Sequence, residues 1–175
     1  MPSSPCERER LFGMSVNETS RAPADAMALA FVMAHRVAES GNVPVGAVVV
    51  IGGEVVARAG NLRESLQDPT AHAEILALRD ASQRTGRWRL DEATVFVTLE
   101  PCAMCASALV QARVKKVVYA ATEPKTGAHQ SLLRLFEGSA TEVVQDTSAA
   151  AASAEMLARF FQGLRQRERD TRNRR

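Results

Sequence analysis

Three zinc-type ligand side chains and one acidic side chain stand in two short segments of this sequence. His72 and Glu74 are two positions apart, and residues 75–100 separate them from Pro101-Cys102-Ala103-Met104-Cys105. Imidazole nitrogen and thiolate sulfur bind zinc, and a catalytic site keeps three protein ligands while water takes the fourth position. His72, Cys102 and Cys105 supply this number of ligands. The pattern therefore predicts a hydrolytic zinc site.

Glu74 has two interpretations. As a fourth ligand it would close the site and make the zinc structural, whereas as an unligated carboxylate it would act as general acid and base. Structural zinc sites usually have four Cys or His ligands in two close pairs. The motif has no fourth cysteine and no second histidine nearby, and His129 stands in a segment typical of a loop leading into a helix. We therefore expect a catalytic role for Glu74.

The ligand spacing requires two helix starts. Cys102 and Cys105 are three positions apart, so they are adjacent on the first turn of a helix that Pro101 begins. His72 and Glu74 would point about 200° apart inside a regular helix. We therefore place this pair at the opening of a helix, where backbone angles vary. Two helix N-termini are expected to face one zinc ion beside a sheet.

Apolar spacing predicts the elements around the site. Helices are predicted over residues 24–40, 71–85, from Pro101 through 110, 131–136 and from about 149 into the C-terminal end. Strands are predicted over residues 45–51, 54–59, 93–99, 117–120 and 142–144. Gly52-Gly53 indicates a hairpin between the first two strands. Alternating strands and helices are typical of an α/β fold.

The charge is unevenly distributed. The formal net charge is +2, but residues 159–175 carry seven arginines against Glu168 and Asp170, which gives +5 there and −3 elsewhere. This segment is predicted to be a basic helix end and tail. It is either a solvated helix end or a phosphate-binding surface. Residues 1–22 have the composition of a disordered N-terminal extension.

Cysteine use indicates a reducing, cytoplasmic location. Two of the three cysteines belong to the motif, and the third, Cys6, is interpreted as an inert thiol. The first 24 residues contain no apolar stretch of signal-peptide length, and the uncharged run over residues 41–53 is too short to span a bilayer. Neither export nor membrane insertion is expected.

From Ala24 to about Arg165 the sequence resembles the bacterial tRNA-specific adenosine deaminases. The segments that carry the likeness are Val43-Pro44-Val45-Gly46-Ala47, Asp68 to Arg79, Val97 to Cys105, and Lys125-Thr126-Gly127-Ala128. The H-x-E and P-C-x-x-C motifs alone also fit cytidine, cytosine and guanine deaminases. The flanking segments narrow the choice to the tRNA-acting family.

The resemblance implies a three-layer cytidine deaminase-like α/β fold, with a central mixed five-stranded sheet flanked by helices. A zinc deaminase domain would cover residues 23–158. It also implies Zn²⁺, a homodimer, and conversion of adenosine to inosine at the wobble position of a tRNA, typically an arginine tRNA with an ACG anticodon.

Substrate contacts are implied in the same way. Asn61 would hydrogen-bond the flipped nucleoside, Val45 and Leu99 would line the base pocket, and the backbone around Ala73 and Pro101 would contact the base edge. The alternative for Asn61 is a turn residue after the hairpin, because Gly-Asn is a strong turn dipeptide.

Four RNA contacts are implied as well: Glu123, Lys125, Phe161 and Arg165. The family usually has the shorter Asp where Glu123 stands. After the aromatic pair that Phe160-Phe161 matches, the family has an arginine-rich segment, and Gln162-Gly163-Leu164 replaces part of it here. Phe160-Phe161 is either core packing or a stacking surface for a base.

Two rival functions remain on the residues alone. A deaminase of a free base or nucleoside, such as guanine or cytosine, would use the same ligands and the same glutamate. An RNA-binding module with a structural zinc would need no unligated carboxylate beside a three-ligand site.

Overall fold

Five strands form one sheet in the structure, a computed structural model that describes residues 26–173. They are β1 (Gly46–Ile51), β2 (Glu54–Gly60), β3 (Thr94–Leu99), β4 (Lys116–Ala121) and β5 (Glu142–Gln145). Their spatial order is β2-β1-β3-β4-β5. β1 is antiparallel to β2 and β3, whereas β3, β4 and β5 run parallel. The mixed five-stranded sheet is confirmed, and each strand begins and ends within one residue of its predicted range.

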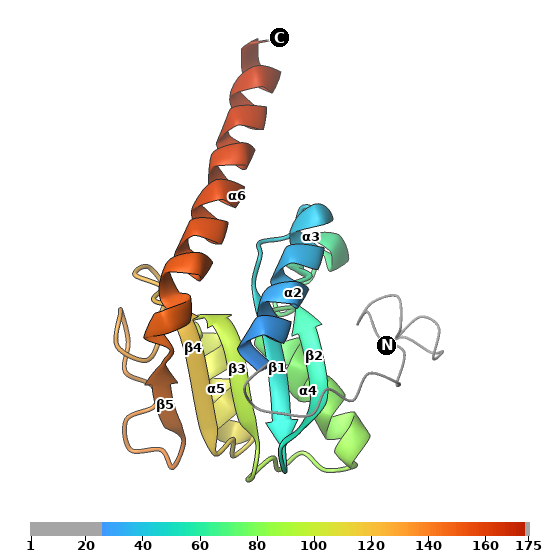
Figure 1. The fold of residues 1–175 in the computed structure, drawn as a ribbon, viewed down its shortest axis with the longest axis vertical. Coiled ribbons are helices and arrows are strands. Elements are labelled where there is room, and N and C mark those ends of the chain that lie inside the picture. The colour runs from blue at the N-terminus through green and yellow to red at the C-terminus, as the bar shows by residue number, and fades with distance from the viewer. Residues whose placement is uncertain (1–25, 174–175) are drawn as a thin grey trace.

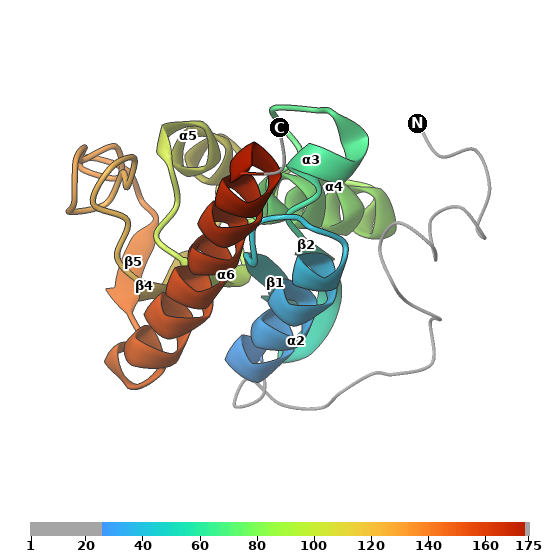
Figure 2. The same cartoon turned by 90° about the horizontal axis from the view of Figure 1, so that it is seen from above.

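Helices cover both faces of this sheet (Figure 2). α2 (Ala26–Glu39) and α6 (Thr147–Asn173) lie on one face, and α4 (Ala73–Thr85) and α5 (Ala103–Gln111) lie on the other. Successive side chains of a strand point to opposite faces. In β1, Ala47 and Val49 therefore pack in the core with α4, whereas Val48 and Val50 pack with α2. The three-layer α/β arrangement is confirmed.

The two helix starts beside the motif differ from their predicted positions. α4 begins at Ala73 instead of residue 71, because Asp68 accepts the N–H and the hydroxyl of Thr70 and keeps this segment in a turn. α5 begins at Ala103 instead of Pro101, and Cys102 is paired with a distant residue in an isolated β-bridge. Both starts move by two residues toward the C-terminus.

The short helix predicted over residues 131–136 is wrong, because this segment forms turns. The carboxylate of Glu100 accepts the N–H groups of residues 129–131. The N–H of Leu133 donates to the carbonyl of Gly127 and not to a carbonyl four residues earlier. The N–H of Leu135, which would donate to the carbonyl of residue 131 in a helix, donates instead to the carbonyl of Ala128.

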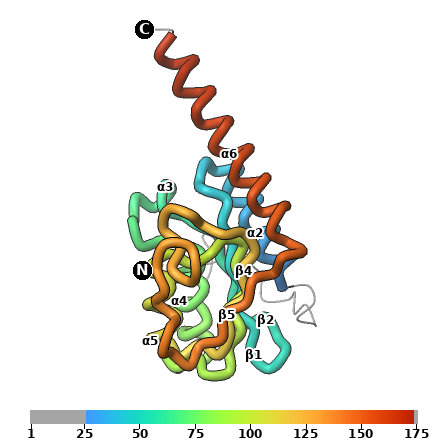
Figure 3. Tube along the Cα trace, turned by 90° about the vertical axis from the view of Figure 1, so that its left-hand side faces the viewer, coloured from blue at the N-terminus to red at the C-terminus, as the bar shows by residue number. Residues whose placement is uncertain are grey.

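The last helix extends beyond the sheet (Figures 1 and 3). Its first part packs on β3 and β4, where the Ser153 hydroxyl donates to the carbonyl of Thr98. Every residue from Arg165 to Asn173 is exposed. None of the described helices is both long enough and apolar enough to cross a membrane. The predictions for residues 1–22, including Cys6, lie outside the described residues.

Candidate active site

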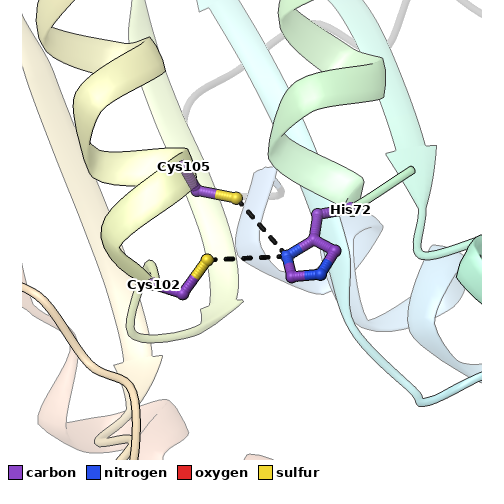
Figure 4. A group of neighbouring side chains, drawn as sticks. All are labelled: His72, Cys102 and Cys105. Atoms are coloured by element: carbon purple, nitrogen blue, oxygen red, sulfur yellow. Dashed lines mark hydrogen bonds between the residues drawn. The ribbon is translucent and has the colours of Figure 1, made fainter. Parts of the chain in front are cut away.

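His72 and Cys102 each occupy the position directly before a helix. His72 precedes α4 with φ −74° and ψ 151°, and Cys102 precedes α5 with φ −73° and ψ 174°. Both residues therefore have extended backbone, and the 200° rotation of a regular helix does not separate His72 from Glu74. Cys105 follows on the first turn of α5. The two helix starts bring their ligands together as predicted (Figure 4).

The three ligand atoms have the separations that a zinc ion requires. His72 Nδ1 lies 3.6 Å from Cys102 Sγ and 3.5 Å from Cys105 Sγ (Figure 4). With tetrahedral angles and ordinary Zn–N and Zn–S bonds, nitrogen and sulfur would be about 3.5 Å apart. Within residues 26–173 no other group of three potential ligands is this close. His129 lies apart from this group, and its ring forms a T-shaped contact with the ring of Tyr119.

The two cysteine thiols influence each other's protonation. Hydrogen bonds from Cys105 and from His72 together lower the pKa of Cys102 to about 4, although burial opposes this change. The hydrogen bond to Cys102 and burial together raise the pKa of Cys105. One thiolate thus disfavours a second beside it. A divalent cation bound between them would stabilise both, so the chemistry of these ligands also fits zinc.

Glu74 is a buried carboxylate beside the ligands. Its side chain is 4% exposed, and it lines the same pocket as His72 and Cys102. Burial raises its pKa above the usual range for glutamate. It does not belong to the group of potential metal ligands. A carboxyl with a raised pKa is suited to accepting and returning protons near neutral pH.

A pocket of about 210 Å³ opens onto the ligands. Six of the residues implied to contact substrate or RNA line it: Val45, Asn61, Ala73, Leu99, Glu123 and Phe161. Pro101, Lys125 and Arg165 do not line it. The Pro101 carbonyl accepts the N–H of Ala128, and the side chains of Lys125 and Arg165 are exposed.

Asn61 lies at the pocket wall directly after β2. Its Nδ2 donates to the carbonyl of Val43 at 3.3 Å, and its Oδ1 accepts the N–H of Arg63 at 3.4 Å. These local bonds match the interpretation of Asn61 as a turn residue. An amide side chain has two N–H donors and two acceptor positions. One N–H donor and one acceptor position of Asn61 therefore remain for a ligand in the pocket. Asn61 can be both a turn residue and a substrate contact.

A short helix not predicted from the sequence follows Asn61. This helix is α3 (Arg63–Leu66). The buried side chain of Asn42 accepts the N–H groups of Glu64 and Ser65 at 3.1 and 3.0 Å. A residue distant in the sequence therefore satisfies the first donors of the helix, which local sequence patterns do not reveal.

Glu123 and Phe161, two of the residues implied to contact RNA, each contact a nearby residue of the chain. Glu123 Oε1 accepts the N–H of Lys125 at 2.8 Å, so this carboxylate stabilises its own turn. The ring of Phe161 meets that of Phe160 edge to face, with centroids 5.5 Å apart. Phe161 is 40% exposed and lines the pocket. Its position fits a stacking surface better than a core residue.

Four residues that line the pocket were not predicted as site residues: Val43, Arg63, Glu100 and Thr126. Burial alone would raise the pKa of Glu100, but hydrogen bonds from Ser131, Gln130 and Glu123 lower it to about 2. The sequence contained one signal for Glu100. It is an acidic residue between an apolar strand and the cysteine motif, and a buried charge at such a place is costly unless other groups hydrogen-bond to it.

Residues 23–165 match the family model described as MafB19-like deaminase. The tRNA-specific adenosine deaminase of Bacillus subtilis (strain 168) is 45% identical over 143 residues, which cover 79% of this chain and 88% of that protein.

Two solved structures share the fold. One comes from a study of A-to-I editing by tRNA:A34 deaminases at the wobble position of transfer RNA. It is 44% identical, with a TM-score of 0.68 over 70% of this chain and 97% of its own. A guanine deaminase from Nitrosomonas europaea is 21% identical, with a TM-score of 0.72 over 85% of this chain and 94% of its own, and shows likeness of fold alone. The chain belongs to the MafB19-like deaminases and, within them, to the tRNA-specific adenosine deaminases.

Proposed function

We propose that this protein catalyses the zinc-dependent hydrolytic deamination of adenosine to inosine at the wobble position of an arginine tRNA with an ACG anticodon. The observation that carries the proposal is a pocket lined by His72, Cys102 and the buried Glu74, with Cys105 Sγ 3.5 Å from His72 Nδ1. The identity to the Bacillus subtilis tRNA-specific adenosine deaminase supports a tRNA adenosine as the target. The choice of arginine tRNA rests on the sequence resemblance.

The chain's own residues account for the proton transfers. His72, Cys102 and Cys105 would hold Zn²⁺ and leave one coordination position open. When bound there, zinc lowers the pKa of a water molecule toward neutrality and so supplies a hydroxide nucleophile. Glu74 would accept the proton that the water loses and pass it to the ring nitrogen of adenine. It would then accept the proton of the new hydroxyl group on C6 and give it to the leaving amine. The net reaction consumes one water and releases one ammonia.

The pocket fits a base that has left its stack, which an enzyme acting on a nucleobase requires. Apolar walls come from Val45 and Leu99, and a polar wall comes from Asn61. We assign hydrogen bonding of the nucleoside to Asn61. Contact with the base faces is assigned to Val45 and Leu99, and contact with the base edge to the backbone around Ala73 and Pro101.

A substrate assay separates this proposal from a deaminase of a free base or nucleoside. The purified protein is incubated with an arginine tRNA that has an ACG anticodon, and separately with free adenosine, cytidine, cytosine and guanine. We expect inosine in the tRNA and no ammonia from the free compounds. Ammonia from a free compound without inosine in the tRNA would favour the alternative, and tRNA binding without any product would favour a binding module.

The arginines at the end of α6 are the proposed phosphate contacts. They lie exposed on a helix that projects beyond the sheet (Figure 1). Truncation after Gly163 should weaken tRNA binding and flatten its salt dependence, because each lost phosphate contact lowers the logarithmic slope by about 0.7 to 0.9. Turnover at saturating tRNA should change much less, since the zinc ligands lie elsewhere. Binding measured at several salt concentrations tests this prediction.

Two milder variants control for damage to the fold. A cut after Glu168 leaves more of α6 in place, and replacing Arg165, Arg167 and Arg169 with glutamine keeps the full helix. If affinity and salt slope are unchanged in all three proteins, the tail is a solvated helix end. The phosphate contacts would then move to other basic residues: Arg87, Arg89, Lys115 and Lys116.

We also propose a homodimer located in the cytoplasm. Leu132, Leu133 and Leu135 are exposed close together in the turn segment before β5, and grouped apolar side chains of this kind are typical of protein interfaces. The cysteine use supports a reducing compartment. Sedimentation equilibrium should give about twice the chain mass of 18.9 kDa, and a monomeric mass would contradict the dimer.

A further inference from the structure

Glu100, directly after β3, organises the 123–131 loop, which follows β4. Glu100 is 2% exposed, and both oxygens of its carboxylate accept hydrogen bonds from this loop. Oε1 accepts the N–H groups of residues 129–131 at 3.0, 3.0 and 3.1 Å. Oε2 accepts the N–H of Glu123 at 3.0 Å and the hydroxyl of Ser131. One carboxylate therefore joins the first and last residues of the loop.

Gly127 allows the loop to close over this carboxylate. A Cβ at this position would lie 2.6 Å from Cδ and Oε2 of Glu100, and 2.5 Å from the carbonyl oxygen of Glu123. Any side chain there would push the loop away from the carboxylate. Gly127 also forms the isolated β-bridge with Cys102. The loop is thus attached both to Glu100 and to the segment that carries a zinc-type ligand.

The loop forms part of the pocket wall. Glu123 and Thr126 line the pocket together with Glu100. The loop contains no helix and no strand, so few of its N–H groups have the carbonyl partners of regular structure. Without this buried carboxylate, donors at both ends of the loop would lose their acceptors. Such a loss is costly enough to change the conformation of the loop.

We propose that Glu100 is a positioning residue for the substrate, because its carboxylate holds the 123–131 loop in place as one wall of the nucleotide pocket. It neither binds the metal nor transfers protons, since loop donors occupy both oxygens and it lies outside the cluster of His72, Cys102 and Cys105. The identity of the substrate rests on the proposed function, whereas the anchoring of the loop does not.

Glu100→Gln is the direct test. Glutamine keeps the size of the side chain but turns one acceptor into a donor, which then faces donors of the loop. We expect KM for tRNA to rise by about tenfold or more, kcat to fall by less than about threefold, and zinc content to stay at the wild-type value. Hydrogen exchange should become faster in the 123–131 loop and stay unchanged in α4 and α5.

Two further variants make the test decisive. Ser131→Ala removes the Ser131 hydroxyl, one of the five donors to the Glu100 carboxylate, and should raise KM by less than Glu100→Gln does. If Glu100→Gln does not fold, the KM of Ser131→Ala tests the anchoring role. Glu142→Gln removes an exposed acid on β5 and should change neither KM nor loop exchange. An unchanged KM in Glu100→Gln and Ser131→Ala would overturn the proposal. Loss of zinc in either variant would overturn it too, because Glu100 would then support the metal site.

The exchange measurement separates this proposal from the proposed function. If the wild-type protein forms no inosine in any tRNA, the proposed function fails. Faster exchange confined to the 123–131 loop in Glu100→Gln would still support the anchoring role. Unchanged exchange there would overturn the anchoring role, whatever the substrate is.

Discussion

Replacing Glu74 with alanine should lower turnover by about a hundredfold or more while the protein keeps its zinc. Glu74 is buried at the pocket beside His72 and Cys102, but it is not a member of the ligand group. The variant would therefore retain all three ligands and lose the carboxylate that we propose transfers protons. Single-turnover formation of inosine at saturating tRNA, together with metal analysis of the same sample, measures both effects.

Glu74→Gln is the matched control for the space that alanine leaves. Glutamine fills the same volume but cannot accept the proton, so its turnover should be as low as that of Glu74→Ala. Nearly normal activity in both variants would remove the proton-transfer role. Loss of zinc in Glu74→Ala would instead make Glu74 a ligand and the site structural.

Replacing Cys105 with alanine should remove the zinc and with it all measurable turnover. Cys105 is fully buried on the first turn of α5, and its Sγ lies 3.5 Å from His72 Nδ1. Two remaining ligands are too few for a stable tetrahedral site, which needs three from the protein and one water. Metal analysis should give about one zinc per subunit for the wild type and far less for the variant.

Cys6→Ala is the control for the loss of a thiol as such. The sequence predicts that Cys6 is not a ligand, so this variant should keep its zinc and its activity. Stoichiometric, tightly held zinc in Cys105→Ala would contradict the ligand assignment. Loss of zinc in Cys6→Ala would instead make Cys6 a ligand and contradict its interpretation as an inert thiol.

The strands and long helices could be predicted because their signals are local. β1 and β2 follow an apolar run and an alternating run around Gly52-Gly53, and α4 ends at Gly86 in the left-handed conformation. The predictions failed where distant residues supply the hydrogen bonds. Asn42 holds the start of α3, and the carbonyl of Ala128 accepts the Leu135 N–H that a helix over residues 131–136 would use. Local patterns do not contain such partners.

The sequence by itself determined the zinc-type ligands and the unligated carboxylate, because the chemistry of His72, Glu74, Cys102 and Cys105 depends on residue type and short spacing. Only the tertiary structure decided that His72 Nδ1 lies within 3.6 Å of sulfurs 30 and 33 residues away. It also decided that Glu100 anchors a loop at the pocket. Such distances depend on how helices pack against a sheet, and this packing depends on the whole core and not on any one segment.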